Sequence, residues 1–314
     1  MLRPVIAVIG PTAVGKSDLS LVLARELDGE VINADSMQLY QGMDIGTAKL
    51  TERERAGVPH HLLDLWPVTR AASVSEYQTL ARAAIADIQE RGRTPILVGG
   101  SGLYVRAAID DLKFPGTDPD LRAALEREVD EVGPEALHAR LASVDPAAAA
   151  AILPSNGRRI VRALEVVQLT SRPFSATLPT YESMLPARHI GLELPRLELD
   201  RRVTARVDRM WKLGFVDEVR GLVDVGLREG RTASRALGYA QVLRHLDGDL
   251  TDDEAAAQTV LATKRFVRRQ ESWFRRDPRI AWLPADSPDL ADQALGLGDG
   301  RLAGGLHRRA TDDG

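Results

Sequence analysis

The stretch GPTAVGKS, residues 10–17, decides the fold of this chain. It follows the apolar run VIAVI, residues 5–9, and fits the pattern G-x-x-x-x-G-K-[ST], a loop whose backbone N–H groups cradle phosphate oxygens. The apolar run predicts a buried parallel strand. Residues 18–27 predict a helix whose amino terminus brings a partial positive charge to the loop. We interpret this strand, loop and helix as a site for a phosphorylated ligand; a glycine-rich turn that binds nothing is the alternative.

The residue types within the loop indicate individual roles. Lys16 is expected to neutralise phosphate oxygens, and the hydroxyl of Ser17 is expected to help hold Mg²⁺. The same pattern is typical of ATP-binding and other nucleotide-binding sites. The predicted phosphate-binding residues are Gly10, Pro11, Thr12, Ala13, Val14, Gly15, Lys16 and Ser17.

The composition excludes several kinds of site. The 314 residues contain no cysteine, so disulfides, thiolate metal sites and thiol catalysis are excluded. No apolar run is long enough to span a membrane and the first residues do not resemble a signal peptide, so we expect a cytoplasmic enzyme with no membrane partner. The net charge of −4 does not by itself indicate a nucleic-acid partner.

Strand and helix patterns divide the chain. Short apolar strands and amphipathic helices lie on either side of a helix-only stretch, which predicts an α/β fold. We expect a P-loop NTPase-like parallel sheet core flanked by helices, with an inserted all-helical subdomain. The predicted parts are 1–114 for the first half of the core, 115–186 for the insertion, 187–284 for the second half with a basic helical arm, and 285–314 for a flexible C-terminal tail.

Two further predicted strands end in polar residues or glycines. The short strand predicted within residues 30–36 ends in Asp35, and because parallel strands end at one edge of a sheet, Asp35 is expected to face the same cleft as the phosphate loop. A cap for the following turn is the alternative role. The strand at 95–98 runs into Gly99-Gly100-Ser101, where nucleoside triphosphatases with this loop usually have an Asp that holds Mg²⁺. The bound phosphate is therefore predicted to be a handle or a leaving group instead of the transferred group.

Positive charge is concentrated in two helical stretches. Residues 264–279, KRFVRRQESWFRRDPR, carry one Lys and six Arg against one Glu and one Asp, and such local charge attracts phosphate backbones. The aromatic residues of this stretch are expected to pack inward and leave the arginines exposed. In the insertion, Arg158 and Arg162 lie one helical turn apart, which indicates either a basic binding face or a solvated charged surface.

Seven motifs together resemble one family. They are GPTAVGKS, ADSMQLYQGMDIGTAK, VPHHLLD, VGGSGLY, RRIVRALEV, RALGY and TKRFVRRQESWF. Their order resembles that of the tRNA dimethylallyltransferases (tRNA isopentenyltransferases), over residues 4 to about 283. The chain departs from the family pattern at Ser101, where Thr is usual, at Gly157, where Asp is common, and at Ala240-Gln241 and Lys264.

The resemblance implies a reaction and its residues. A dimethylallyl group would move from dimethylallyl diphosphate to the exocyclic N6 amine of the adenine 3′-adjacent to the anticodon (position 37), in tRNAs that read codons beginning with U. The product would be N6-(dimethylallyl)adenosine, diphosphate would leave, Mg²⁺ would be the cofactor, and the enzyme would be a monomer. The implied catalytic residues are Asp35, as general base on the amine, with Lys16 and Ser101. The residues implied to contact the tRNA anticodon stem-loop are Asp35, Ser36, Met37, Gln38, Ser101, Arg122, Arg158, Arg159 and Arg162.

Three alternatives stay open. A small-molecule or nucleotide kinase would bind ATP in the loop, and the missing strand-end Asp weighs against it. A prenyltransferase that acts on free adenine nucleotides would not need the insertion or the arginine-rich arm. A non-catalytic RNA-binding switch protein is disfavoured because Asp35 is predicted to lie in position for chemistry.

Overall fold

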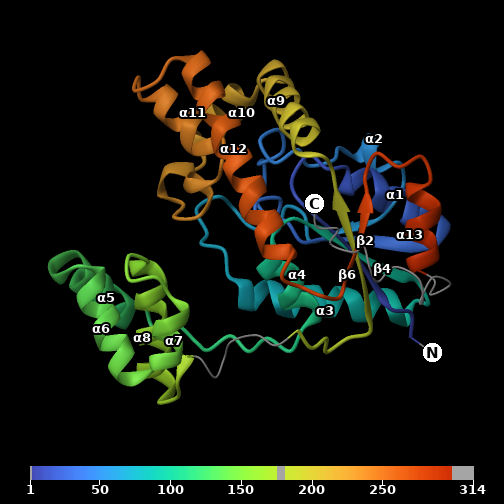
Figure 1. Ribbon diagram of the computed structural model, residues 1–314. Helices are drawn as coiled ribbons and strands as arrows, with labels where there is room; N and C mark the ends of the chain where they lie inside the picture. The colour runs from blue at the N-terminus through green and yellow to red at the C-terminus, as the bar shows by residue number, and fades with distance from the viewer. Residues whose placement is uncertain (1, 175–180, 299–314) are drawn as a thin grey trace, which may run out of the picture. The chain divides into compact units, whose positions relative to one another are not determined.

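A parallel β-sheet forms the centre of the protein. The computed structural model describes residues 2–174 and 181–298. Its six-stranded sheet has the order β3-β2-β4-β1-β5-β6, and every pair of neighbours is parallel (Figure 1). The predicted P-loop NTPase-like parallel core is confirmed. The strands are β1 Val5–Ile9, β2 Gly29–Asn33, β3 His60–His61, β4 Thr94–Gly99, β5 Ala187–Glu193 and β6 Ile280–Pro284.

The unit that contains the sheet also has nine α-helices among its described residues. Among the described residues, none of the helices has both the length and the hydropathy needed to cross a bilayer. The helices of this unit are α1 Lys16–Glu26, α2 Glu52–Arg55, α3 Val74–Glu90, α4 Gly102–Ile109, α9 Arg196–Lys212, α10 Phe215–Asp224, α11 Tyr239–Leu246, α12 Asp252–Phe274 and α13 Leu290–Gly298. Short 3-10 turns lie at Leu227–Glu229 and Ala233–Arg235.

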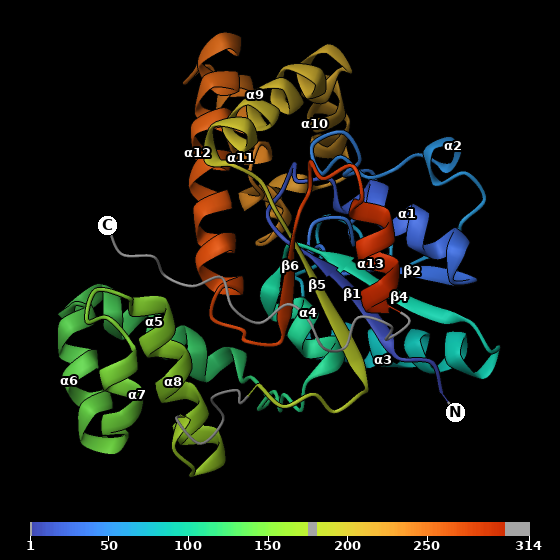
Figure 2. The ribbon, with the colours of Figure 1, turned by 45° about the vertical axis from the view of Figure 1, so that its right-hand side comes forward.

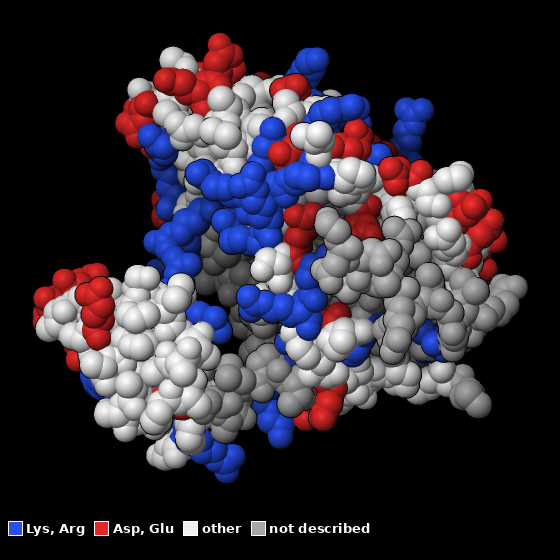
Figure 3. Space-filling view, viewed as in Figure 1, with Lys and Arg blue, Asp and Glu red and all other residues white. Residues whose placement is uncertain are grey.

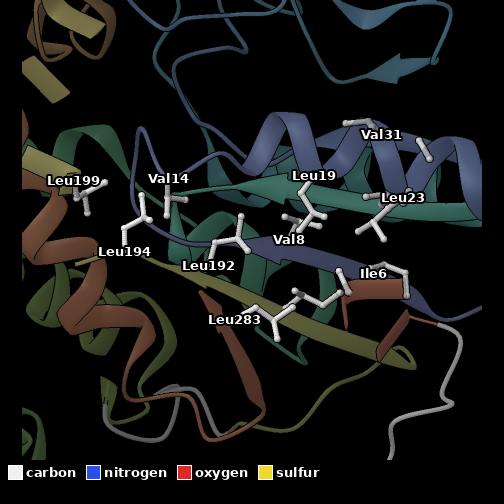
Figure 4. Packing of buried hydrophobic residues seen from close by; sticks show 14 of the residues in the cluster. Ile6, Val8, Val14, Leu19, Leu23, Val31, Leu192, Leu194, Leu199 and Leu283 are labelled. Atoms are coloured by element: carbon white, nitrogen blue, oxygen red, sulfur yellow. The ribbon is translucent and has the colours of Figure 1, made fainter. Parts of the chain in front are cut away.

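Apolar side chains are buried on both faces of the sheet. Leu19 and Leu23 of α1 point toward Val8 of β1 (Figure 4), within a core cluster that also draws on α9, α12 and α13. The alternate strand residues Ala7 and Leu97 are buried as well, and α3 and α4 pack together on that side. Burial on both faces is typical of a parallel sheet and explains why its strands are continuous apolar runs.

The regular secondary structure in the described part of the insertion is all helical, as predicted. The insertion forms a compact unit, Asp111–Glu182, with an apolar core of its own that includes Leu125, Leu141 and Ile160. The predicted boundaries 115–186 therefore lie slightly too late along the chain. Its helices are α5 Pro119–Val132, α6 Pro134–Val144, α7 Pro146–Ala151 and α8 Gly157–Thr170.

The chain leaves the core for the insertion and returns to it at neighbouring points. Asp110 and Ser183 form an antiparallel bridge, and the N–H of Met184 donates to the carbonyl of Ile109 at 2.9 Å. Arg279 donates to Asp110 Oδ1 at 2.6 Å and to the Ser183 hydroxyl at 2.8 Å. One guanidinium thus ties both connecting segments to the core.

A last helix corrects the prediction of a flexible tail from residue 285. The helix α13 lies beside α1 (Figures 1 and 2), and its Ala294 is fully buried in the core. Gly, Asp and Ala dominate the composition here, yet Leu290, Ala294 and Leu297 recur at helical spacing and pack inward. The rest of the predicted tail, residues 299–314, lies outside the described residues.

Candidate active site

The phosphate loop has the predicted position between β1 and α1. Gly10 has φ 145° and Gly15 has φ 105°, values that favour glycine. A Cβ on Gly10 would lie 2.7 Å from the carbonyl oxygen of Leu192, so the loop also passes too close to β5 for a side chain. Gly15 occupies the N-cap of α1 and offers no side-chain acceptor, so the first N–H groups of the helix are available to an anion.

Lys16 is held inside this loop. Its Nζ donates to the carbonyl of Pro11 at 2.7 Å. The pKa of Lys16 is lowered to about 7, first by burial and second by the positive charge of Arg206, whereas the charge of Asp35 acts to raise it. A bound diphosphate adds negative charge here, which favours the protonated form of Lys16.

Arg206 of α9 completes the positive wall of the site. Its guanidinium donates to Thr12 Oγ1 at 2.9 Å and to the carbonyl of Thr47 at 3.1 Å. Burial lowers the pKa of Arg206 below its usual value, and Asp35 opposes that change. No motif in the sequence indicates this residue. The available signal was its position on α9, in helical register with the buried residues Val203 and Met210, where an arginine needs a partner.

Asp35 lies at the end of its strand, as predicted. Its side chain also caps the following turn, which was the alternative role. Asp35 follows β2, and Asn33 fixes it through two hydrogen bonds with its backbone. Its Oδ1 accepts from the N–H of Met37 at 2.9 Å. Its Oδ2 makes no hydrogen bond within the described part of the chain. One oxygen therefore shapes the turn while the other is left for a ligand.

Ser101 joins this group from β4. It occupies the N-cap of α4, and its Oγ lies 3.4 Å from both the backbone N and the Oγ of Ser36. Gln38 donates from Nε2 to the carbonyl of Thr47 at 3.2 Å. The ends of β1, β2 and β4 thus bring the predicted catalytic residues to one edge of the sheet.

Gln270 of α12 connects two of these strand ends. Its Oε1 accepts from the N–H of Thr12 at 3.0 Å, and its Nε2 donates to the carbonyl of Gly100 at 2.9 Å. The sequence alone does not indicate this role, because the partners of Gln270 are far away along the chain. A buried glutamine one turn before Trp273, on the inner face of a basic helix, was the only local signal.

The outer face of α12 is strongly basic. Figure 3 shows Lys and Arg side chains gathered over this helix. Arg265, Arg268 and Arg269 are exposed, as predicted. Phe274 is buried, also as predicted, but Trp273 is 42% exposed, so the expectation that the aromatic residues pack inward was wrong for Trp273.

The arginines of the insertion fall into two groups. Arg158 and Arg159 are exposed. Arg122 and Arg162 instead bind the buried carboxylate of Glu165, at 2.5 and 2.6 Å. Burial alone acts to raise the pKa of Glu165, but the hydrogen bonds from these arginines and from a threonine outweigh it and lower the pKa to about 2. Arg122 and Arg162 therefore stabilise the helical unit through their ion pairs with Glu165.

The residues of the site fit a Mg²⁺ ion that would be bound mainly through the phosphates of the substrate. Ser17 lies in the first turn of α1 with its side chain partly exposed. No group of three or more His, Asp or Glu able to hold a metal occurs in residues 2–174 or 181–298. Mg²⁺ commonly takes one or two protein oxygens together with substrate phosphates and water. The donor set therefore suits an ion that is bound together with a diphosphate.

Comparisons with known proteins point to one family. A family model described as IPP transferase matches residues 38–277. The chain is 66% identical over 301 residues to a tRNA dimethylallyltransferase from Thermobifida fusca, covering 94% of each protein. It is 66% identical over 288 residues to a tRNA dimethylallyltransferase from Streptomyces avermitilis, covering 92% of each.

Solved structures give the same result. The fold is similar to that of a tRNA isopentenylpyrophosphate transferase from Bacillus halodurans, with a TM-score of 0.69, 41% identity and 96% of each chain covered. It is also similar to a eukaryotic dimethylallyltransferase acting on tRNA, with a TM-score of 0.83 and 25% identity, over 99% of this chain and 81% of the other.

Proposed function

The chain belongs to the IPP transferase family, and from this premise we propose that it is a tRNA dimethylallyltransferase. It transfers the dimethylallyl group of dimethylallyl diphosphate to the N6 amine of the adenine at position 37, in tRNAs that read codons beginning with U. One observation carries the proposal: Asp35, a carboxylate with an uncommitted oxygen, lies close enough to Lys16 and Arg206 to influence the pKa of each. A proton acceptor and an anion site therefore share one edge of the sheet.

The donor side is built for a leaving diphosphate. As the C–O bond to the dimethylallyl group breaks, negative charge accumulates on the diphosphate. Backbone N–H groups of residues 10–17, the amino terminus of α1, Lys16 and Arg206 are positive groups fixed in place before the reaction, so they stabilise that charge without reorganising. Mg²⁺ held at Ser17 and the phosphates would supply further positive charge at the same atoms.

The acceptor side is built for a weak nucleophile. The lone pair of an adenine amine is delocalised into the ring, so attack on carbon is aided by removal of its proton. Asp35 Oδ2 takes this proton as the N–C bond forms, a contribution on the order of 10² to 10⁴ in rate. Ser36, Gln38 and Ser101, beside Asp35, offer hydrogen-bonding groups to the base.

The end of β4 weighs against phosphoryl transfer. Gly99 and Gly100 lead into Ser101, which occupies the N-cap of α4, so the strand end offers no carboxylate to a Mg²⁺ ion bound at Ser17. A Cβ on Gly99 would overlap the backbone of Ala34. Position 99 therefore has no room for a side chain. These features favour a diphosphate that leaves over a phosphoryl group that is transferred.

The proposed acceptor is an RNA, whose backbone phosphates can bind exposed arginines. A base stacked in an anticodon loop has to be turned out before its amine can enter a cleft. Exposed arginines of α12 supply charge for an RNA backbone, and so does the exposed pair Arg158 and Arg159 of the helical unit. A free adenine nucleotide would need none of these residues.

Product analysis tests the proposal. Purified protein, Mg²⁺, dimethylallyl diphosphate and an unmodified tRNA transcript are expected to yield N6-(dimethylallyl)adenosine, identified by mass spectrometry of the digested RNA. One diphosphate should be released for each modified adenosine, and a transcript with guanosine at position 37 should be inert. If ATP is added, formation of ADP in step with turnover would support a kinase instead. If AMP replaces the transcript, equally efficient prenylation of AMP would support the free-nucleotide alternative.

A further inference from the structure

Glu218 of α10 anchors a loop that lies beside the candidate site. Its carboxylate accepts hydrogen bonds from three consecutive backbone N–H groups, those of Asp44 at 3.1 Å, Ile45 at 2.6 Å and Gly46 at 3.2 Å. The hydroxyl of Tyr239 donates to the same carboxylate at 2.6 Å. A single side chain thus fixes the loop from more than 170 residues further along the chain.

The loop is also held by close packing. A Cβ on Gly46 would overlap the rings of Phe215 and Tyr239, so the backbone lies directly against the helices that carry Glu218 and its partner. At the end of the loop, the Nζ of Lys49 pairs with Asp44 at 2.7 Å, and the Lys49 side chain is only 3% exposed. The path of the loop is therefore fixed at both ends.

The loop presents one carbonyl group to the site. Thr47 follows directly on the residues that Glu218 holds, and its hydroxyl donates to the carbonyl of Met43 at 2.6 Å. Its own carbonyl accepts from Arg206 at 3.1 Å and from Gln38 at 3.2 Å. One backbone oxygen thereby orients a cation of the donor side and an amide of the acceptor side together.

We propose that Glu218 is a positioning residue for both substrates: it holds the loop 44–47 so that the carbonyl of Thr47 aligns Arg206 with the diphosphate and Gln38 with the target nucleotide. The inference rests on the proposed function, which gives Arg206 and Gln38 these substrates. Among residues 2–174 and 181–298, the hydrogen bonds of the Glu218 carboxylate are to the loop and to Tyr239, so its effect passes through the carbonyl of Thr47.

The chemistry of the loop requires a carboxylate at this point. Three successive N–H groups need an acceptor with several lone pairs, and an ionised carboxylate has about four. In Glu218→Gln the shape is kept, but one oxygen becomes an NH₂ group that faces the donors of the loop. The two N–H groups bound to Oε2 can keep their acceptor, whereas that of Gly46 is left facing a donor.

Steady-state kinetics with the full-length protein test this inference. Glu218→Gln is expected to raise the KM for dimethylallyl diphosphate and the KM for tRNA, each by roughly tenfold, corresponding to one misplaced hydrogen bond to a charged group per substrate. Asp217→Asn, a neighbouring exposed carboxylate of α10, is the matched control and should leave both constants unchanged. Tyr239→Phe keeps the carboxylate and removes one donor, so it should shift both constants in the same direction by about twofold or more.

Double-mutant cycles separate positioning from a general loss of structure. In an Arg206→Gln background, Glu218→Gln should no longer raise the KM for the donor, while in a Gln38→Ala background it should no longer raise the KM for tRNA. Effects of unchanged size in both backgrounds would overturn the inference, as would unaltered constants in Glu218→Gln and Tyr239→Phe. A wild-type protein that prenylates no tRNA would instead overturn the proposed function, so the two failures are distinguishable.

Discussion

Arg206 of α9 donates a hydrogen bond of 2.9 Å to the hydroxyl of Thr12 in the phosphate loop, across 194 residues of sequence. The loop is therefore not a self-sufficient anion site in this protein. Arg206, which adds positive charge to the site, lies on a helix that follows the insertion in the sequence.

Arg206→Gln should weaken donor binding. A hydrogen bond to a charged group contributes about 1.5–3 kcal/mol, so the Kd for dimethylallyl diphosphate is expected to rise by on the order of 10- to 100-fold. Isothermal titration with the donor or with inorganic diphosphate measures it. Arg202→Gln, one turn earlier on α9 and paired with Glu198, is the control and should bind normally. Unchanged affinity in Arg206→Gln would remove it from the diphosphate site.

Asp35→Asn should slow the chemical step while leaving donor affinity intact. Asparagine keeps the Oδ1 that accepts from Met37, so the turn is preserved and only the proton acceptor is lost. Single-turnover prenylation should fall by on the order of 10² to 10⁴. A rate near that of the wild type would exclude Asp35 as the general base.

Donor binding should take up a proton above neutral pH. In the free protein the pKa of Lys16 is about 7, so near pH 8 its amine is mostly neutral, and a bound diphosphate raises the pKa and protonates it. Affinity should therefore decrease as the pH rises above about 7. Calorimetry in buffers of different ionisation enthalpy should show uptake approaching one proton in the wild type and none in Lys16→Arg, whose side chain stays charged. Equal uptake in both proteins would contradict the role of Lys16.

Charge reversal on α12 should weaken tRNA binding without affecting the donor. Arg268→Glu with Arg269→Glu is expected to lower tRNA affinity and to reduce the slope of log K against log salt by roughly one for each lost phosphate contact. Filter binding over a range of salt concentrations measures this slope. Arg25→Glu, at the far end of α1 and hence at the opposite edge of the sheet, is the control. An unaltered slope in the α12 variant would mean that this face does not meet the RNA.

The stability of the fold should decline in acid because of a buried histidine in β5. His189 is 7% exposed; its pKa falls from 6.5 to about 4, first because of burial and second because of the charge of Arg279. The unfolded chain binds this proton more tightly, so stability is lost as the pH falls from about 6.5 toward 4. For the urea transition of the unit that contains the sheet, the wild type should lose roughly 2 kcal/mol more of its free energy of unfolding than His189→Gln between about pH 7 and pH 5. Equal losses would assign acid sensitivity to other groups.

The sequence predicts those parts of the site that are encoded locally. The phosphate loop, Asp35 and Ser101 each follow a recognisable strand, and in a parallel sheet the ends of the strands determine one shared edge. The helical insertion follows from the loss of the strand pattern. These parts depend only on neighbouring residues along the chain, and the structure confirms the positions of Asp35 and Ser101 at that edge.

The residues that escaped sequence analysis depend on packing between distant segments. Arg206, Gln270 and Glu218 lie on amphipathic helices, where a polar residue on the inner face has a meaning only once its partner is known. Arg162 shows the converse, because its helical spacing indicates an exposed basic face, whereas a buried carboxylate one turn away binds it. At α13 the composition is rich in Gly, Asp and Ala and does not predict packing, yet leucines at helical spacing pack inward beside α1.

The bridge between Asp110 and Ser183 has a consequence for how the protein unfolds. Because the core itself joins the two ends of the insertion, the 72 residues of Asp111–Glu182 form a closed loop with a separate hydrophobic core. Melting that core leaves the ends joined, and the parallel sheet keeps all its hydrogen bonds. Unfolding of the whole chain is then not a single two-state transition. Calorimetry should resolve two cooperative events, and a destabilising substitution such as Leu141→Ala should move only one of them.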